Sequence, residues 1–203
     1  MFFHQSSGMN FLAHLYLSGG FDEVMVGNLM GDFTVGRIDA TLPAGVQRGI
    51  RLHREIDSFT DAHPVVRAAK HRLFPAYRHY AAVITDVFYD HFLALHWQDY
   101  DAGTLGDFAG QVHRLFAEKE HLLPEAMLPM VRSMAKHNWL PHYATLEGID
   151  RALTRMARRT KFVSGMENAT GDLHKDYAFY DENFRRFFPD LIRHADEFRK
   201  ADP

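Results

Sequence analysis

"RLHREIDSFTDAHP" occupies residues 51–64 and shows how this chain folds. Its apolar residues Leu52, Ile56 and Phe59 recur at intervals of four and three, which is the period of an amphipathic α-helix. Pro64 has no backbone N–H to donate within a helix, so it favours the first turn of the next one. The stretch therefore predicts a helix that ends shortly before Pro64 and a second helix that begins there.

The same period continues outward in both directions, and no convincing alternation typical of a strand appears. Two prolines mark helix boundaries: Pro43 at the start of the helix that contains the opening stretch, and Pro75 as a breaker. We also expect Gly27 and Gly31 to interrupt one helix. The predicted helices cover residues 9–18, 21–33, 43–59, 64–74, 77–97, 105–123, 125–140, 146–160 and 173–200. The sequence thus predicts one compact all-helical domain over 9–203, with 1–8 as an N-terminal extension or cloning remnant before Met9.

Composition narrows the class of protein. The chain has 203 residues, of which 46% are hydrophobic and 17 are Phe, enough for one domain with a sizeable core. A net charge of −3 argues against a protein that coats nucleic acid. No apolar run approaches the roughly 20 residues that span a bilayer, and no signal peptide is visible, so we expect no membrane partner. The lack of cysteine is compatible with the cytoplasm, where we expect the protein, and limits metal ligands to His, Asp, Glu and backbone oxygens.

The opening helix carries polar residues on its dry side. On a helical wheel, His53 and Asp57 fall inside the apolar arc and Asp61 falls at its margin, whereas Arg51 and Glu55 lie on the wet side. An unpartnered carboxylate is costly to remove from water, so it is paired, neutralised or bound to a metal. The pair is therefore either a hydrogen-bonded core pair or part of a metal site.

A second predicted helix, over 77–97, repeats the pattern. Asp86, Asp90 and His91 lie on or beside its apolar arc, while Thr85 and Tyr89 take the opposite side. Asp86 and Asp90 are one turn apart, so their carboxylates can converge. Two like charges on a dry face repel each other unless a proton or a cation lies between them.

Two further segments add polar groups. Asn28 and Asp32 are four residues apart within "VMVGNLMGDF", and each follows a glycine that lets backbone or ligand approach closely. His14 lies within "FLAHLYL", which is apolar nearly all round and where a lone histidine is more often a satisfied core residue. Four segments that each send His or Asp to a dry face suggest one shared site. Imidazole and carboxylate without thiolate suit Mn, Fe, Zn or Mg, and such a site supports hydrolysis.

At these residues the chain resembles the acyl carrier protein phosphodiesterase family. The matching stretches are "MNFLAHLYLS" (9–18), "GNLMGDFTVG" (27–36), "GIRLHREIDSFTDAHP" (49–64) and "DVFYDHFLALHW" (86–97), with weaker matches at "MAKHNWLPHY" (134–143) and "ALTRMARRT" (152–160). The resemblance implies an all-helical fold related to the HD phosphohydrolases. It also implies hydrolysis of the phosphodiester that joins 4′-phosphopantetheine to a serine of acyl carrier protein, with Mn²⁺ as the expected metal and Mg²⁺ or Fe²⁺ as alternatives.

The resemblance also implies site residues. The metal or catalytic positions that stand within the motifs are Asp32, His53, Asp57, Asp90 and His91, followed by Asp86 and His14, then by Asp61 and Asn28. Asp57 or Asp32 would orient the attacking water or act as base, and Arg54 would neutralise phosphate charge. The HD class uses an adjacent His-Asp pair, whereas this chain has Asp90-His91, so which of the two is a ligand stays open.

The expected partner is acidic, because acyl carrier proteins are small acidic proteins as a family. "RMARRTK" (155–161) supplies a basic surface through Arg155, Arg158 and Arg159, to which Arg48 and Arg51 add. The alternative is a solvated helix end.

Two other functions remain open. One is an HD-like phosphohydrolase that acts on a nucleotide or another small phosphate ester. The other is a non-catalytic helical binding protein whose buried His and Asp residues only fix the packing. Metal analysis of the purified protein separates the second from either enzyme.

Overall fold

The computed structural model describes residues 11–202, and every regular element in this range is helical. This confirms the predicted all-helical domain, while the predicted extension 1–8 lies outside the described residues. The helices are α1 (Phe11–Leu17), α2 (Glu23–Met30), α3 (Ala44–Ala62), α4 (Pro64–Tyr77), α5 (Ala81–Leu95), α6 (Leu105–Glu118), α7 (Leu128–Lys136), α8 (Trp139–His142), α9 (Leu146–Ala157), α10 (Ala169–Lys175) and α11 (Tyr177–Ala201).

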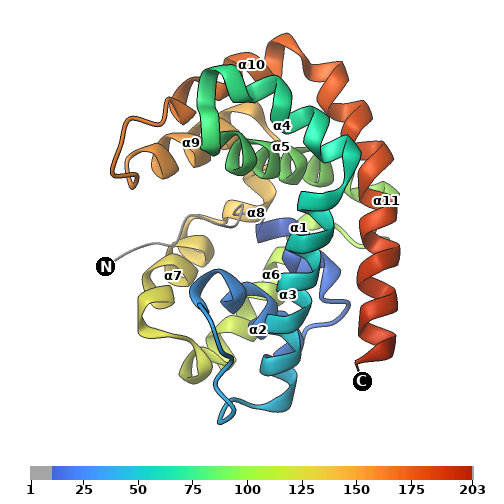
Figure 1. Ribbon diagram of the computed structural model, residues 1–203. Coiled ribbons are helices and arrows are strands. Elements are labelled where there is room, and N and C mark those ends of the chain that lie inside the picture. The colour runs from blue at the N-terminus through green and yellow to red at the C-terminus, as the bar shows by residue number, and fades with distance from the viewer. Residues whose placement is uncertain (1–10, 203) are drawn as a thin grey trace.

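The helices form two halves that share one long helix (Figure 1). One half contains α4, α5, α9 and α10, the other contains α2, α3, α6 and α7, and α1 and α8 lie between them. α11 runs along the side of both halves and packs on α3, α4 and α5. Helices far apart in the sequence thus meet around α1.

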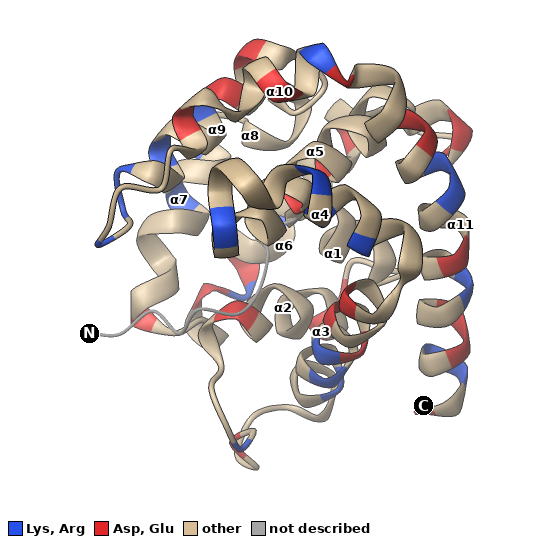
Figure 2. Ribbon diagram, turned by 45° about the horizontal axis from the view of Figure 1, so that its top comes forward, with Lys and Arg blue, Asp and Glu red and all other residues tan. Residues whose placement is uncertain are grey.

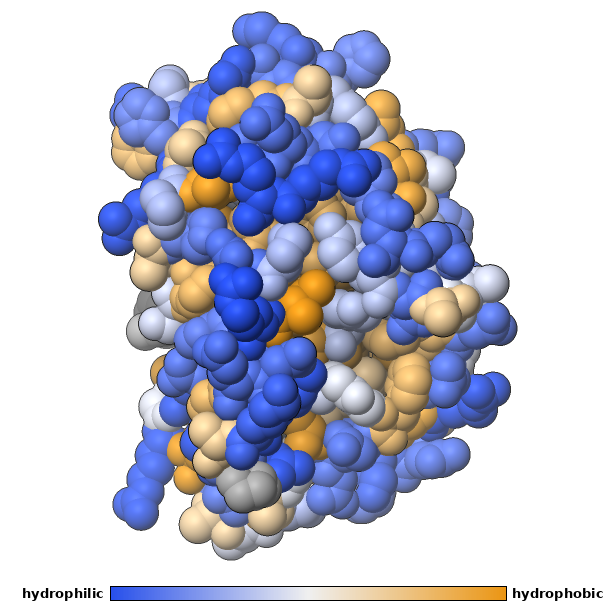
Figure 3. Space-filling view, turned by 90° about the vertical axis from the view of Figure 1, so that its right-hand side faces the viewer, coloured by the Kyte–Doolittle hydropathy of each residue, from blue (hydrophilic) through white to orange (hydrophobic). Residues whose placement is uncertain are grey.

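α11 shows how the sequence pattern builds the core. Tyr180, Phe184, Phe187 and Phe188 recur at helical spacing and are at most 2% exposed. The rings of Phe184 and Phe188 stack with centroids 4.9 Å apart. Burial of such rings contributes roughly 2–3 kcal/mol each. The opposite face of α11 is polar, and that side of the molecule shows apolar atoms only in small patches (Figure 3).

α2 and α3 pack closely because of a glycine. A Cβ added at Gly27 would lie 2.0 Å from the backbone oxygen of Val46, so only glycine allows this approach. The expectation that Gly27 interrupts its helix is wrong, since α2 runs through it to Met30. Gly31, in contrast, does begin a short 3₁₀ turn, Gly31–Phe33. The close contact places the end of α2 directly beside α3.

The predicted break at Pro75 is also wrong, because α4 continues to Tyr77. The proline removes only the hydrogen bond to the carbonyl of His71, and the buried side chains of Leu73 and Tyr77 hold the helix to the core on either side. The chain turns instead at Arg78, whose φ is +53°.

Other boundaries shift for local reasons. The predicted 77–97 helix starts only at Ala81, after a 3₁₀ turn. The predicted 125–140 helix divides at Asn138, which has a left-handed backbone with φ of +46°. The predicted 173–200 helix divides at Asp176, between α10 and α11. The predicted wet side of α5 does not exist, because Thr85 and Tyr89 are 0% and 4% exposed.

Among residues 11–202, no helix combines the length and the apolar character that crossing a membrane requires.

Candidate metal centre

Two histidines and an aspartate, one from α1 and two from α3, lie close together. Nε2 of His14 lies 3.3 Å from Oδ1 of Asp57, and Nε2 of His53 lies 3.2 Å from Oδ2 of the same carboxylate. His53 and Asp57 are one turn apart on α3, as the helical wheel predicts, whereas His14 comes from α1. Both histidines are nearly buried, while the side chain of Asp57 is 30% exposed. The aspartate thus connects two buried rings to the surface.

The orientation of His14 is fixed by Asn28. The side-chain nitrogen of Asn28 donates to the carbonyl of His14 at 2.7 Å and to Oγ of Ser18 at 3.0 Å. The amide oxygen therefore faces Nδ1 of His14, at 2.8 Å, and that nitrogen must carry a proton to donate to it. Nε2 of His14 is left toward Asp57, so a buried amide sets which nitrogen can act as a ligand.

Asp32 borders the same cluster. Its Oδ1 lies 3.6 Å from Nε2 of His53, and its side chain is only 10% exposed. The preceding glycine makes room for the ring, since a Cβ at Gly31 would lie 2.1 Å from Cγ of His53. The glycine that the sequence shows before Asp32 therefore serves a close approach by His53.

The cluster is electrostatically coupled. Burial alone would lower the pKa of His14, but the hydrogen bond and charge of Asp57, with smaller effects of Asp32 and Asn28, raise it to about 9. Burial would raise the pKa of Asp57, but His14 and His53 hold it well below its usual range. In the metal-free protein, His14 and Asp57 therefore form a charged pair at neutral pH.

The donor set fits a divalent ion. One ligand atom from each of His14, His53 and Asp57 can be chosen so that all lie within 4.8 Å of one another. Nδ1 of His53 is buried without a hydrogen-bond partner among the described residues, whereas Nε2 of His14 and Nε2 of His53 face Asp57 at 3.3 and 3.2 Å. The two Nε2 atoms and a carboxylate oxygen are therefore close enough together to share one cation. Two imidazoles and a carboxylate suit Mn²⁺, Fe²⁺ or Zn²⁺.

Asp90, another predicted site residue, lies outside this cluster. It is fully buried, and its two oxygens accept the backbone N–H groups of Leu12 and Ala13 at 3.0 and 2.9 Å. These are unpaired donors of the first turn of α1. Burial raises the pKa of Asp90 to about 7, although the two N–H groups oppose the shift. Asp90 thus anchors the helix that carries His14 and does not join the His14–His53–Asp57 cluster.

His91 and Asp86 are also not brought into the cluster. Nδ1 of His91 lies 2.7 Å from the carbonyl of Tyr143, and Nε2 lies 2.8 Å from the hydroxyl of Tyr177, so both nitrogens have protein partners. Burial, aided by the charges of Asp57, Asp61 and Asp90, raises the pKa of Asp86 to about 8, while Lys70 opposes the shift. Asp86 is therefore within electrostatic reach of Asp57 without contacting it.

The remaining predicted residues lie around the centre. Arg54 donates to the carbonyls of Thr34 and Gly36, on the segment that follows Asp32. Asp61, whose side chain is 75% exposed, pairs with Lys70. Arg54 thus holds the backbone of residues 34–36 through hydrogen bonds, and Asp61 is a surface residue.

The two additional predicted surface cations, Arg48 and Arg51, both donate to Asp202 near the end of the chain.

Two residues of this cluster, His14 and Asn28, stand late in the order of candidate site residues derived from the sequence. His14 came after five other positions because its segment is apolar all round, and Asn28 came last. The signal that could have found Asn28 is its four-residue spacing from Asp32 and its place in a buried run. No pattern in the sequence indicates that its amide would face His14.

Comparison with known proteins gives one consistent family. The family model described as "Acyl carrier protein phosphodiesterase" matches residues 9–191. A protein of that name from Photorhabdus laumondii is 35% identical over 189 residues, covering 93% of this chain and 96% of the relative. Relatives of the same name from Klebsiella pneumoniae and Serratia proteamaculans are 32% and 31% identical, covering 93% and 92% of this chain and 98% and 97% of the relatives. No solved structure matches the chain.

Proposed function

The chain belongs to the acyl carrier protein phosphodiesterase family, and we propose on this basis that it removes 4′-phosphopantetheine from holo-acyl carrier protein. It is then a phosphoric diester hydrolase whose products are apo-acyl carrier protein and free 4′-phosphopantetheine. The observation that supports this most is the cluster of His14, His53 and Asp57, whose ligand atoms lie within 4.8 Å of one another.

We propose that His14, His53 and Asp57 hold one divalent ion, with Mn²⁺ as the expected metal. When bound, such an ion supplies Lewis-acid polarisation of the phosphoryl oxygens and lowers the pKa of water. Asn28 keeps Nε2 of His14 directed to the site, and Gly31 gives His53 its room. Asp90 holds α1, and with it His14, through two backbone N–H groups.

Asp32 is the proposed general base. Its carboxylate lies beside His53 and is mostly buried, at a position where it can accept a proton from the attacking water. Water oxygen forms a bond to phosphorus, and the bond from phosphorus to the serine oxygen of the carrier breaks. The serine oxygen takes up a proton, and the phosphomonoester leaves with the pantetheine chain. Arg54 positions the segment after Asp32 through its two backbone contacts.

Mass spectrometry of the carrier tests this proposal. Holo-acyl carrier protein is incubated with protein stripped by chelator and then supplied with Mn²⁺, Mg²⁺ or no ion. We expect the carrier to lose the mass of 4′-phosphopantetheine with Mn²⁺ and to keep it in chelator. A panel of nucleotides and simple phosphate esters runs alongside.

Two results would contradict parts of the proposal. Hydrolysis of a nucleotide with an unchanged carrier would replace the substrate while keeping the metal site. Equal hydrolysis of the carrier in chelator and in Mn²⁺ would remove the metal from the reaction.

A further inference from the structure

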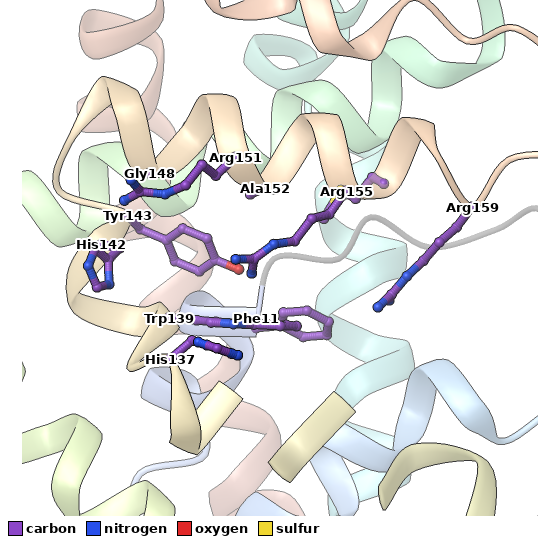
Figure 4. Close-up of a pocket in the computed structure, with 11 residues that line it drawn as sticks. Phe11, His137, Trp139, His142, Tyr143, Gly148, Arg151, Ala152, Arg155 and Arg159 are labelled. Atoms are coloured by element: carbon purple, nitrogen blue, oxygen red, sulfur yellow. The ribbon is translucent and has the colours of Figure 1, made fainter. Parts of the chain in front are cut away.

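A cavity of about 280 Å³ opens beneath α9 (Figure 4), and its lining does not include His14, His53 or Asp57. Its floor is aromatic, formed by Phe11, Trp139 and Tyr143. One wall is cationic, formed by Arg151, Arg155 and Arg159, whose side chains extend from α9 and the turn after it. No Asp or Glu lines the cavity. This lining favours a ligand that combines apolar groups with negative charge.

The floor contains an unsatisfied donor. Nε1 of Trp139 is buried and has no hydrogen-bond partner among the described residues. An indole N–H can only donate, so the group that satisfies it must be an acceptor. The guanidinium of Arg155 stands over the same ring, 5.3 Å from its centroid. A carboxylate in the cavity can accept from Arg155, and a small rotation of the indole would bring Nε1 of Trp139 within its reach.

Several arginines of the described chain are held by carboxylates. Arg51, Arg72 and Arg132, for example, each pair with a carboxylate of a distant residue. In the cavity wall Arg151 pairs with Glu147 at 2.6 Å. The exposed side chains of Arg155, Arg158 and Arg159, in contrast, make no hydrogen bond or ion pair with any described residue. A helix C-terminus favours cations in general, but it does not explain the unsatisfied Trp139 beside them.

Apolar side chains stand next to these charges. Phe162 and Val163 follow Arg159 in the loop after α9 and are 63% and 97% exposed. The basic segments at the end of α9 and on this loop lie at the left of Figure 2. Exposed apolar groups rimmed by charge mark interaction sites. The whole surface therefore matches an acidic protein segment that also carries apolar side chains.

We propose that this cavity is the docking site for an acidic segment of the carrier protein, with one carboxylate seated between Trp139 Nε1 and Arg155. The inference rests on the proposed function, because the carrier is the acidic protein that this function supplies. Arg158, Arg159, Phe162 and Val163 form the rim of the docking site. This docking site would recognise the protein part of the substrate and would take no part in the hydrolytic chemistry.

Binding of apo-acyl carrier protein tests the site, because the apo form has no phosphodiester to hydrolyse. Affinity is measured by fluorescence or calorimetry for the wild type, Trp139→Phe, Arg155→Glu and Arg114→Glu. We expect Trp139→Phe and Arg155→Glu each to weaken binding about tenfold or more, and the loss to shrink at high salt. Arg114 on α6 is the matched control, since it too is exposed and unpaired within residues 11–202 but lines no cavity, and its reversal should change affinity less than twofold.

Wild-type affinity in both Trp139→Phe and Arg155→Glu would overturn the docking site. So would an equal loss in Arg114→Glu, since that would show only general charge attraction. Arg155 is exposed, so its variant tests the proposal even where Trp139→Phe folds poorly. Cavity-dependent binding of the carrier without hydrolysis of its holo form would reject the proposed function and leave the docking site standing.

Discussion

The imidazole rings of His14 and His53 stack with centroids 4.2 Å apart and an interplanar angle of 22°. Each ring directs a nitrogen at a different oxygen of Asp57. Two protonated imidazoles in this arrangement would repel each other, so the stack favours a state in which a single cation is shared. A divalent ion held by both rings and the carboxylate meets that requirement, since it binds neutral imidazole.

Replacing Asp57 by Asn tests the carboxylate. The amide keeps the shape but removes the negative charge shared by the two histidines, and it is a weak metal ligand. We expect Mn²⁺ affinity and hydrolysis of holo-carrier to fall by at least about 100-fold, since even outer partners of ligands cost roughly 10–100-fold. The matched control is Asp61→Asn, one turn along α3, which loses only a surface pair with Lys70. Equal losses in both variants would contradict the assignment.

Metal binding should release a proton. Because the pKa of His14 is raised to about 9 in the metal-free protein, an ion that takes Nε2 must displace its proton. We expect about one proton to be released for each ion bound near neutral pH. The affinity for Mn²⁺ should therefore rise about tenfold for each unit of pH below 9. Calorimetry in buffers of different ionisation enthalpy measures the proton count. A count of zero would show that His14 is not a ligand.

Gly31→Ala tests the packing of His53. The added Cβ would overlap the ring, so the ring or the helix must move. We expect a loss of about 1–3 kcal/mol in the free energy of unfolding and a drop of at least about tenfold in Mn²⁺ affinity. Gly110→Ala on α6 is the control, because nothing lies within 4 Å of its added Cβ. It should leave metal binding unchanged and add about 0.5–1 kcal/mol of stability.

The stability of the metal-free protein should fall as pH rises from about 4 to 8. Burial raises the pKa of Asp86 from 3.8 to about 8, so over this range the folded state holds a proton that the unfolded state has lost. One such proton lowers the free energy of unfolding by up to about 1.4 kcal/mol per pH unit. Asp86→Asn should remove this part of the slope and be more stable than the wild type at pH 8. Asp90, and above about pH 6.5 also His14, account for the remaining slope. Urea unfolding in chelator measures it, and parallel pH profiles would contradict it.

The sequence predicts the part of the candidate metal centre that lies within a single helix. His53 and Asp57 share a face of α3, and the wheel identifies them without any knowledge of the fold. It also predicts correctly that Asp86, Asp90 and His91 are buried. It does not predict what they contact, because a wheel gives the direction of a side chain and not the helix that lies opposite.

Other features depend on tertiary packing. The polar residues Thr85 and Tyr89 suggest a wet side for α5, but neighbouring helices enclose this helix almost completely. Pro75 is a correct signal for lost hydrogen bonding, yet buried neighbours keep α4 intact beyond it. The cavity beneath α9 is lined by residues from α1, α8 and α9. The hydrophobic periodicity of each helix alone does not predict how these helices meet.

The bond from Asp90 to α1 sets an order of events during synthesis of the chain. α1 has only seven residues, and isolated helices shorter than about 12 residues are marginal in water. The N–H group of Leu12, in the first turn of α1, finds its acceptor only in the side chain of Asp90, which follows 78 residues later in the chain. His14 leaves the ribosome before α5, but it takes its place only after α5 has emerged and folded. A chain that stops before α5 therefore lacks the completed cluster of His14, His53 and Asp57, and the proposed metal site forms late in folding.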